Sequence, residues 1–436
     1  MKYENSNSIP VKAERKSTFR SIMIIGILFF IFGFITWLNS VLVPYLKIAC
    51  ELNNFQSYFV VTSFYISYLV MALPSAWILK ITGLKKGMSL GLLIMAIGAF
   101  IFIPAAYTRT YEVFLLGLFI LGTGLAVLQT AANPYITILG PIESAAKRIS
   151  IMGICNKVAG ALAPIVLGAI LLDNMDGVIN EISNMNLEAK EKSLDMLSQR
   201  VVLPYLIMMG VLIFLSIMIY FSPLPDVDTD TEKETGVKQT IGKKNIFQFP
   251  QLLLGALAMF LYVGVEVIAG DTVISYALSL GIDSGTAKLF TTYTLVAMIV
   301  GYLIGIVIIP KYISQEKALS TSAVVGIVFS SCAIFTEGFI SVLFISLLGL
   351  ANALVFPAIW PLAINGLGKF TKIGSSFLIM ALAGGAIIPL GYGYLADLFN
   401  AKTAYWIVIP CYLFLGYYSI KGYKIRFSSN DKNKHH

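Results

Sequence analysis

A succession of long apolar segments, separated by short polar ones, is the feature that most constrains how this chain can fold. A helix needs about 20 mostly apolar residues to cross a bilayer, and twelve segments meet that requirement. Hydrophobic residues make up 57% of the chain and charged residues 12%, too few to cover a soluble globule. We therefore predict an all-α membrane protein whose twelve transmembrane helices span residues 21–46, 57–80, 87–107, 112–139, 148–172, 201–222, 250–277, 285–309, 317–336, 338–366, 373–396 and 402–421.

The reactive residue types exclude several classes of function. The only two histidines are His435 and His436, so no interior histidine can hold haem or zinc or activate a serine. The four cysteines are scattered among apolar segments and show no disulfide or metal-binding pattern. The net charge of +8 is not clustered, so we expect no nucleic acid partner. We predict that the chain is not an enzyme and has neither a catalytic residue nor an organic cofactor.

The distribution of Lys and Arg indicates the orientation. With the N-terminus placed in the cytoplasm, every cytoplasmic connection carries basic residues, and most of the 31 Lys and Arg residues lie on that side. This is the positive-inside pattern of bacterial membrane proteins. It predicts cytoplasmic N- and C-termini for a multi-pass protein of the cell inner membrane, surrounded by lipid.

A charged segment divides the apolar sequence into two halves. Residues 223–249 contain prolines, aspartates, glutamates and lysines, and we interpret them as a cytoplasmic linker. A second polar segment, residues 173–200, is predicted outside, and its end from about residue 188 to 200 can form a surface helix. The predicted parts are an N-terminal tail, a six-helix bundle, the linker, a second six-helix bundle and a C-terminal tail, at 1–20, 21–222, 223–249, 250–421 and 422–436.

Short sequence matches relate the two halves to each other. Residues 160–168 read GALAPIVLG, and residues 385–393 read GAIIPLGYG. The first and seventh spans also align, and this alignment places Ser40 opposite Asp271. Parallel six-helix repeats that enclose a substrate site near the midplane are the arrangement of the major facilitator fold. We therefore predict this fold, with two pseudo-symmetric six-helix bundles that function as a monomer.

Three ionisable residues stand out within predicted spans, where burial is costly and usually indicates function. Lys157 lies in the fifth span, and either pairs structurally with a carboxylate or carbonyls or takes part in gating. Glu266 lies in the middle of the seventh span, where a carboxylate can carry a proton or bind a cation. Asp271 follows it, nearer the extracellular end, where it is either functional or simply solvated. The candidate groups for a coupling ion are Glu266, Asp271 and Ser40.

Uncharged polar and aromatic residues within the spans form a candidate substrate site. Amides donate and accept hydrogen bonds at once, which matches adjacent sugar hydroxyls, and aromatic faces can stack on a sugar ring. The alternatives are interhelical hydrogen bonds for the amides and interface anchoring for the tryptophans. No arginine lies in the interior of a span, and only Arg148 lies at a span boundary; this disfavours an anionic substrate, so we predict a neutral monosaccharide. The candidate substrate-binding residues are Asn39, Gln129, Asn133, Asn156, Glu266, Asn352, Trp360 and Trp37.

The fourth span carries a string that resembles the fucose permease family of the major facilitator superfamily. Residues 125–141 read LAVLQTAANPYITILGP, and residues 33–47 and 373–397 support the resemblance. Within that family the chain is most similar to the glucose/galactose transporter branch, which includes sodium-dependent glucose transporters of animals. The resemblance implies cation-coupled symport of a hexose such as glucose or galactose, taken up by alternating access.

Departures from the family pattern bear on the coupling ion. The fucose permease carries Asn-Asp where this chain has Asn39-Ser40, and Glu where it has Gln129, so both of its proton-linked carboxylates are replaced. Glu266 fits the YVGxE pattern of the glucose/galactose branch. These features favour Na⁺ as the coupling ion. Proton coupling through Glu266, a sugar uniporter, and a drug/H⁺ antiporter of the same fold are the alternatives.

Overall fold

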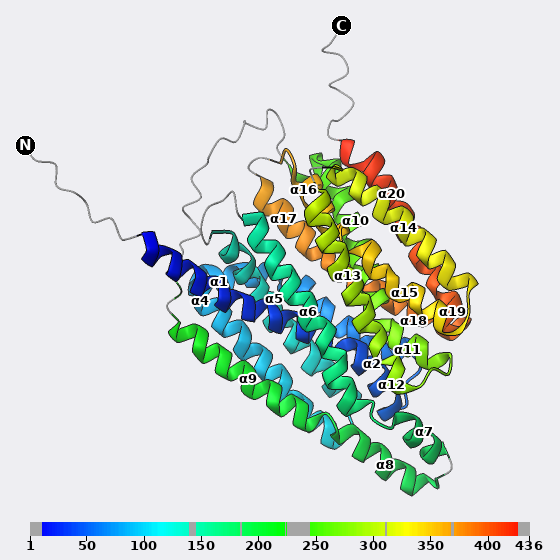
Figure 1. Ribbon diagram of the computed structural model, residues 1–436. Helices are drawn as coiled ribbons and strands as arrows, with labels where there is room; N and C mark the ends of the chain where they lie inside the picture. Colours follow the sequence, from blue (N-terminus) through cyan, green and yellow to red (C-terminus); the bar gives the residue numbers. More distant parts are fainter. Residues whose placement is uncertain are drawn as a thin grey trace, which may run out of the picture.

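The computed structural model describes residues 11–138, 145–183, 185–222, 224, 245–309, 312–367 and 370–425, and Figure 1 shows their arrangement. Within these ranges the side chains of 11–20, 133–134, 136–150, 183, 371–373 and 375–376 are outside the description. Helices make up almost all of the described residues, and no strand occurs among them.

The first half of the chain forms a bundle of long and short helices, with α7 and α8 together at one end (Figure 1). The helix α8 confirms the helix expected at about 188–200. The elements of this half are α1 (Val11–Thr36), α2 (Asn39–Ala49), α3 (Asn54–Ser57), α4 (Phe59–Thr108), α5 (Tyr111–Ile138), α6 (Ala145–Leu171), α7 (Met175–Ser183), α8 (Leu187–Gln199) and α9 (Val202–Phe221).

The second half forms a similar bundle with more interruptions in its helices. Most of the predicted linker, residues 223 and 225–244, lies outside the described residues, so the division into parts stays a prediction. The elements are η3 (Ile246–Gln248), α10 (Pro250–Val267), the π-helical turn η4 (Ile268–Thr272), α11 (Val273–Ser279), α12 (Ser284–Ala287), α13 (Leu289–Ile308), α14 (Gln315–Phe335), α15 (Gly338–Asn352), α16 (Val355–Ile364), α17 (Thr371–Met380), η6 (Ala381–Ala383), α18 (Gly384–Leu398), α19 (Ala401–Ala404), η7 (Tyr405–Ile407), α20 (Val408–Ile420) and η8 (Gly422–Lys424).

The twelve predicted spans are all helical in the structure. Eleven helical segments of the described chain are long and apolar enough to cross a membrane, and one of them, Asn54–Thr108, contains both the second and the third predicted span. These two spans are separated at Gly83, whose φ of 74° and ψ of 168° are not helical. Glycine alone adopts such a conformation without strain, so this position allows the chain to turn with almost no loop.

The first helices of the two halves are interrupted at matching positions. The first span breaks between α1 and α2, just before Ser40, and the seventh changes to the π-helical turn that contains Asp271. Ser40 and Asp271 are the residues that the internal alignment places opposite each other. Interruptions of this kind are tolerated in membrane helices where the backbone is buried in protein or lines a cavity. The structure therefore agrees with the predicted repeat.

The helices of each half pack on one another, and a smaller set joins the halves. In the first half α4 packs on α5 and α9, and α1 packs on α6; in the second half α15 packs on α13 and α14, and α10 packs on α18. Across the halves α6 packs on α13, α18 on α3 and α4, and α2 on η4 and α11. In Figure 1 α7, α8, α12 and α19 lie at the end of the bundle away from the start of α1, and we call this the distal end.

Candidate functional site

A largely buried ion pair joins the two halves. Lys157 of α6 donates from Nζ to Oε1 of Glu266 on α10 at 2.8 Å, and their side chains are 11% and 14% exposed. Lys157 lies at the middle of α6 (Ala145–Leu171), and Glu266 lies near the middle of the segment Pro250–Ser279. The pair satisfies two charges that would be costly to bury separately. Both residues were predicted to lie within membrane spans, and the structure shows that they pair with each other.

Trp37 lies directly beside this pair and between the halves. Lys157 Nζ is 4.9 Å from the centroid of the Trp37 ring, a distance typical of a cation–π contact. The ring is held between Gly160 and Gly270: a Cβ at Gly160 would come within 2.3 Å of its Cδ1, and one at Gly270 within 1.9 Å of its Cζ3. Because these glycines belong to different halves, Trp37 occupies a space that only the closed interface provides.

Tyrosines surround the carboxylate of Glu266. Tyr262, one turn earlier on α10, interacts with it, and Tyr302 of α13 and Tyr412 of α20 lie within electrostatic range. Tyr412 donates to Oδ1 of Asn352 at 2.8 Å, while the Nδ2 atom of Asn352 is buried without a partner among the described residues. The ion pair is therefore at the edge of a polar and aromatic cluster rather than in a purely apolar core.

Gln129 and Asn156 both point toward neighbouring helices. Gln129 donates to the hydroxyl of Tyr68 at 3.1 Å, and the ring of Tyr68 stacks on that of Tyr65 with centroids 6.0 Å apart. Asn156 donates weakly to the backbone oxygen of Phe29 at 3.4 Å. Sequence reasoning did not single out Tyr65 and Tyr68. Their spacing of three residues places them on one face of a helix, a signal that would have identified them.

The remaining predicted site residues have local partners or lie outside the described side chains. Asn39 and Ser40 donate to the backbone oxygens of Thr36 and Trp37, at 3.4 and 2.8 Å, and so stabilise the break in the first span. The side chain of Asn133 is outside the description. Trp360 stacks on Phe356 with centroids 5.6 Å apart, and Phe356 in turn contacts Tyr262. Their roles in binding stay predictions.

Asp271 is the second carboxylate of the seventh span, and its surroundings differ from those of Glu266. The residue has no exposed surface, and neither carboxylate oxygen has a hydrogen-bond partner among the described residues. The alternative that Asp271 is simply solvated is therefore wrong for this conformation. Among the described residues no group of three or more histidines, cysteines and acidic residues could hold a metal ion.

The halves are held together at the distal end by two carboxylates that cross the interface. Asp397 at the end of α18 accepts from the backbone N–H groups of Asn54 and Phe55, at 3.0 and 2.7 Å. Asp176 of α7 accepts from the backbone N–H and the hydroxyl of Ser284, both at 3.0 Å. Each carboxylate thus meets the first turn of a helix in the other half, where the helix dipole favours negative charge. We call these two contacts the distal clamps.

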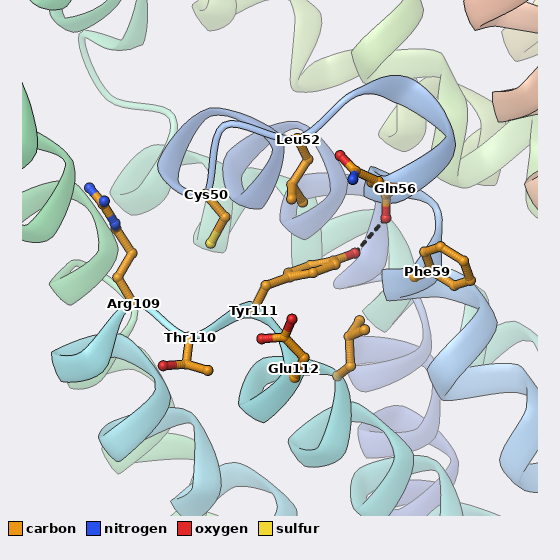
Figure 2. A pocket seen from close by; sticks show the side chains of 9 residues that line it. Cys50, Leu52, Gln56, Phe59, Arg109, Thr110, Tyr111 and Glu112 are labelled. Atoms are coloured by element: carbon orange, nitrogen blue, oxygen red, sulfur yellow. Dashed lines mark hydrogen bonds between the residues drawn. The ribbon is translucent and has the colours of Figure 1, made fainter.

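A separate pocket of about 670 Å³ opens in the first half, between α3 and the connection of α4 to α5 (Figure 2). Arg109, Thr110 and Glu112 line it together with Cys50, and the hydroxyl of Tyr111 closes one side by donating to the backbone oxygen of Gln56 at 2.6 Å. Arg109 is engaged with Glu191. None of the predicted substrate or ion residues lines this pocket.

Comparison with known proteins identifies the family to which this fold belongs. Residues 25–389 match the family model of the Major Facilitator Superfamily. The chain belongs to the major facilitator superfamily. The predicted fold and the predicted membership are therefore confirmed, and the protein is a multi-pass transporter of the inner membrane rather than an enzyme.

Several members of the superfamily are similar over almost the whole chain. A protein of Brucella abortus called a glucose/galactose transporter is 35% identical, over 91% of this chain and 93% of its own. The L-fucose-proton symporter of Escherichia coli is 30% identical, over 88% and 89%. The crystal structure of FucP in an outward conformation, 27% identical, superposes with a TM-score of 0.68 over 92% of this chain and 98% of that one.

Proposed function

We propose that this protein takes up a hexose, such as glucose or galactose, together with a cation, by alternating access of its two halves. The observation that carries the proposal is the buried Lys157–Glu266 pair, which bridges the halves beside Trp37. Substrate sites of this superfamily fold lie near the midplane between the repeats. A ligand that reaches the pair can therefore contact both halves at once and favour their closure around it.

The chemistry of the pair supports a neutral substrate with many hydroxyl groups. A lysine and a glutamate offer donors and acceptors while their charges cancel, so a sugar can bond to both without a net charge to balance. An organic cation would be repelled by Lys157, and an organic anion would be repelled by Glu266. No other charged group among the described neighbours of the pair compensates either repulsion. Trp37 and the tyrosines add aromatic faces for the apolar side of a sugar ring. These features favour a sugar over the substrates of a drug antiporter.

The named relatives support the same substrate class. The Brucella protein is called a glucose/galactose transporter, and the Escherichia coli protein is called a symporter of L-fucose and protons. For the coupling ion, the sequence favours Na⁺, whereas the name of the second relative favours protons. The uniporter alternative needs no ion at all.

Sugar binding and ion coupling are tested separately with the purified full-length protein. A titration panel of glucose, galactose, fucose, mannose and N-acetylglucosamine, with and without Na⁺, is expected to show saturable binding of one or more hexoses. Counterflow of a labelled hexose in proteoliposomes should then occur without any ion gradient. If no hexose binds while lipophilic cations do, the protein is a drug transporter and the proposal is wrong.

Gradients of Na⁺ and of protons, imposed one at a time on the same vesicles, identify the coupling ion. Accumulation above the external sugar concentration under one gradient alone assigns that ion. Equilibration without accumulation under both gradients indicates a uniporter.

A further inference from the structure

The seventh span contains a local irregularity that surrounds Asp271. A π-helical turn, η4, replaces the regular helix, and such turns leave backbone carbonyls outside the usual hydrogen-bond pattern. Threonine hydroxyls donate to three successive carbonyls here, at 2.6 to 3.2 Å: Thr272 to Ile268, Thr294 to Ala269 and Thr291 to Gly270. Each of these carbonyls thus already accepts a hydrogen bond, whereas the carboxyl group of Asp271 has no partner among the described residues.

The burial of Asp271 depends on both halves of the transporter. Helix α2 of the first half packs on η4, and the Trp37 ring lies against Gly270, the residue next to Asp271. Tyr58, which directly precedes α4, and Tyr65 of α4 are close enough to interact with it electrostatically. When the halves separate at the distal end, these covering groups move away with the first half, and water can reach the carboxyl group.

The charged groups near Asp271 do not compensate it. Glu266 is the nearest carboxylate on the same span and is itself paired with Lys157. Tyr405 of η7 shares a hydrogen bond with Thr272 rather than with Asp271. No described lysine or arginine forms an ion pair with it. Burying an ionised carboxylate without a partner is very costly, so the closed state of the distal end is stable only while Asp271 is the neutral acid.

We propose that Asp271 carries the coupling proton, because the distal end can close only after its carboxylate has taken up a proton from the water on that side. When the proton later leaves to the water on the other side, an unpaired buried carboxylate remains. That state is unfavourable and drives the distal end to reopen. The proton is thus gained before closure and lost before reopening, and this order couples its movement to that of the sugar. The assignment rests on the proposed sugar transport.

Sodium fits this position less well. A hard cation binds through several oxygen ligands, and each of the nearest backbone carbonyls already shares one of its two lone pairs with a threonine hydroxyl. The residue that repeats Asp271 in the first half is Ser40, whose hydroxyl is bonded to the Trp37 carbonyl and cannot titrate in this range. The structure therefore favours protons over the Na⁺ ion that the sequence favours.

The test compares the wild type with Asp271→Asn, which keeps the shape of the neutral acid but cannot release a proton. In proteoliposomes with a proton gradient of one pH unit and no Na⁺, the wild type should accumulate hexose up to about tenfold for one proton per sugar. The Asp271→Asn protein should equilibrate hexose without accumulating it and should retain counterflow. Asp283→Asn, which alters an exposed acidic residue near the distal end, should accumulate hexose like the wild type.

Accumulation by Asp271→Asn under the proton gradient, or accumulation by the wild type under a Na⁺ gradient alone, would overturn the assignment. Infrared difference spectroscopy gives a readout that needs no sugar. The wild type at pH 7 should show a carboxylic acid C=O band that is absent from Asp271→Asn, and a wild-type spectrum without that band would also overturn it. Absence of hexose counterflow in the wild type, with the acid band present, would reject the sugar substrate and leave the protonated aspartate standing.

Discussion

The carboxylate of Asp397 binds the first turn of the helix that begins at Asn54, although the two residues belong to opposite halves of the transporter. Its Oδ1 atom accepts from the backbone N–H and from the side-chain amide of Asn54, at 3.0 and 2.7 Å. Lys47 donates to the same Asn54 side chain at 2.6 Å. This network closes the seam between α18 and α3 at the distal end.

Replacing Asp397 should loosen that seam. Loss of a side chain that accepts from a helix N-terminus typically costs about 1 kcal/mol, which corresponds to roughly fivefold more opening. In Asp397→Asn we expect the amides of residues 54–58 to exchange with deuterium about fivefold faster, as measured by mass spectrometry. Glu188→Gln, a change in the exposed first turn of α8, is the control. Equal exchange in both variants would argue against a clamp.

Removing one partner of the central ion pair should harm stability more than removing both. A single buried charge left without its partner typically costs 3–5 kcal/mol. Glu266→Gln and Lys157→Gln should therefore each lower the melting temperature more than the double variant does. All three should lose hexose binding, since the pair provides the hydrogen bonds. Melting temperatures that fall additively in the double variant would show that the pair is not coupled.

Substitution of the amide residues of the candidate site should weaken hexose binding, whereas substitution of a polar residue outside the site should not. We expect Gln129→Ala, Asn133→Ala and Asn156→Ala to weaken hexose binding about tenfold or more, since each loses a hydrogen bond to a buried ligand. Thr108→Ala, at the exposed end of α4, should bind like the wild type. Isothermal titration of each variant measures the difference. If the three amide variants match Thr108→Ala, the amides only connect helices.

The close contact of Trp37 with Gly160 gives a matched pair of alanine variants on one helix. A Cβ at Gly160 would lie 2.3 Å from the indole, whereas a Cβ at Gly153 meets nothing within 4 Å. Gly160→Ala should therefore displace Trp37 and slow counterflow at least tenfold, while Gly153→Ala should leave it unchanged. Similar rates for the two variants would mean that the indole can move without consequence.

The thiol of Cys50, which lines the pocket of Figure 2, should react with maleimide at a rate that depends on pH. Burial raises the pKa of this thiol to about 11, although the positive charge of Arg109 opposes the shift. Because the thiolate is the reactive form, maleimide labelling should be slow at pH 7 and should accelerate about tenfold per pH unit up to pH 10. The measurement uses a variant in which Cys50 is the only cysteine. A labelling rate that is constant from pH 7 to 9 would contradict this environment.

The membrane spans could be predicted from the sequence because each must satisfy the same physical requirement, an apolar length that matches the bilayer. The pairing of Lys157 with Glu266 could not, since it depends on how the fifth span of one half approaches the seventh of the other. The sequence kept a paired lysine among its alternatives but could not name the partner. Likewise, the contact of Trp37 with Gly160 and Gly270 is a property of the assembled interface, and no spacing within one span encodes it.

The internal repeat could be predicted from the sequence, but the different surroundings of the two equivalent residues could not. The alignment of Ser40 with Asp271 is visible in the sequence, and both residues lie at helix interruptions in the structure. What the sequence could not provide is that the serine finds a backbone acceptor while the aspartate finds no partner among the described residues. Burial and partners are three-dimensional properties, so the coupling role we propose for Asp271 rests on them.

The position of the two distal clamps has a consequence for how the molecule moves. One clamp joins α18 to α3, and the other joins α7 to α12, the helices that follow α6 and precede α13 in the chain. A hinge that opened only one seam would leave the other bonded. Both must release in the same event, so the distal end is expected to open in a single cooperative step, with each half moving as a rigid body.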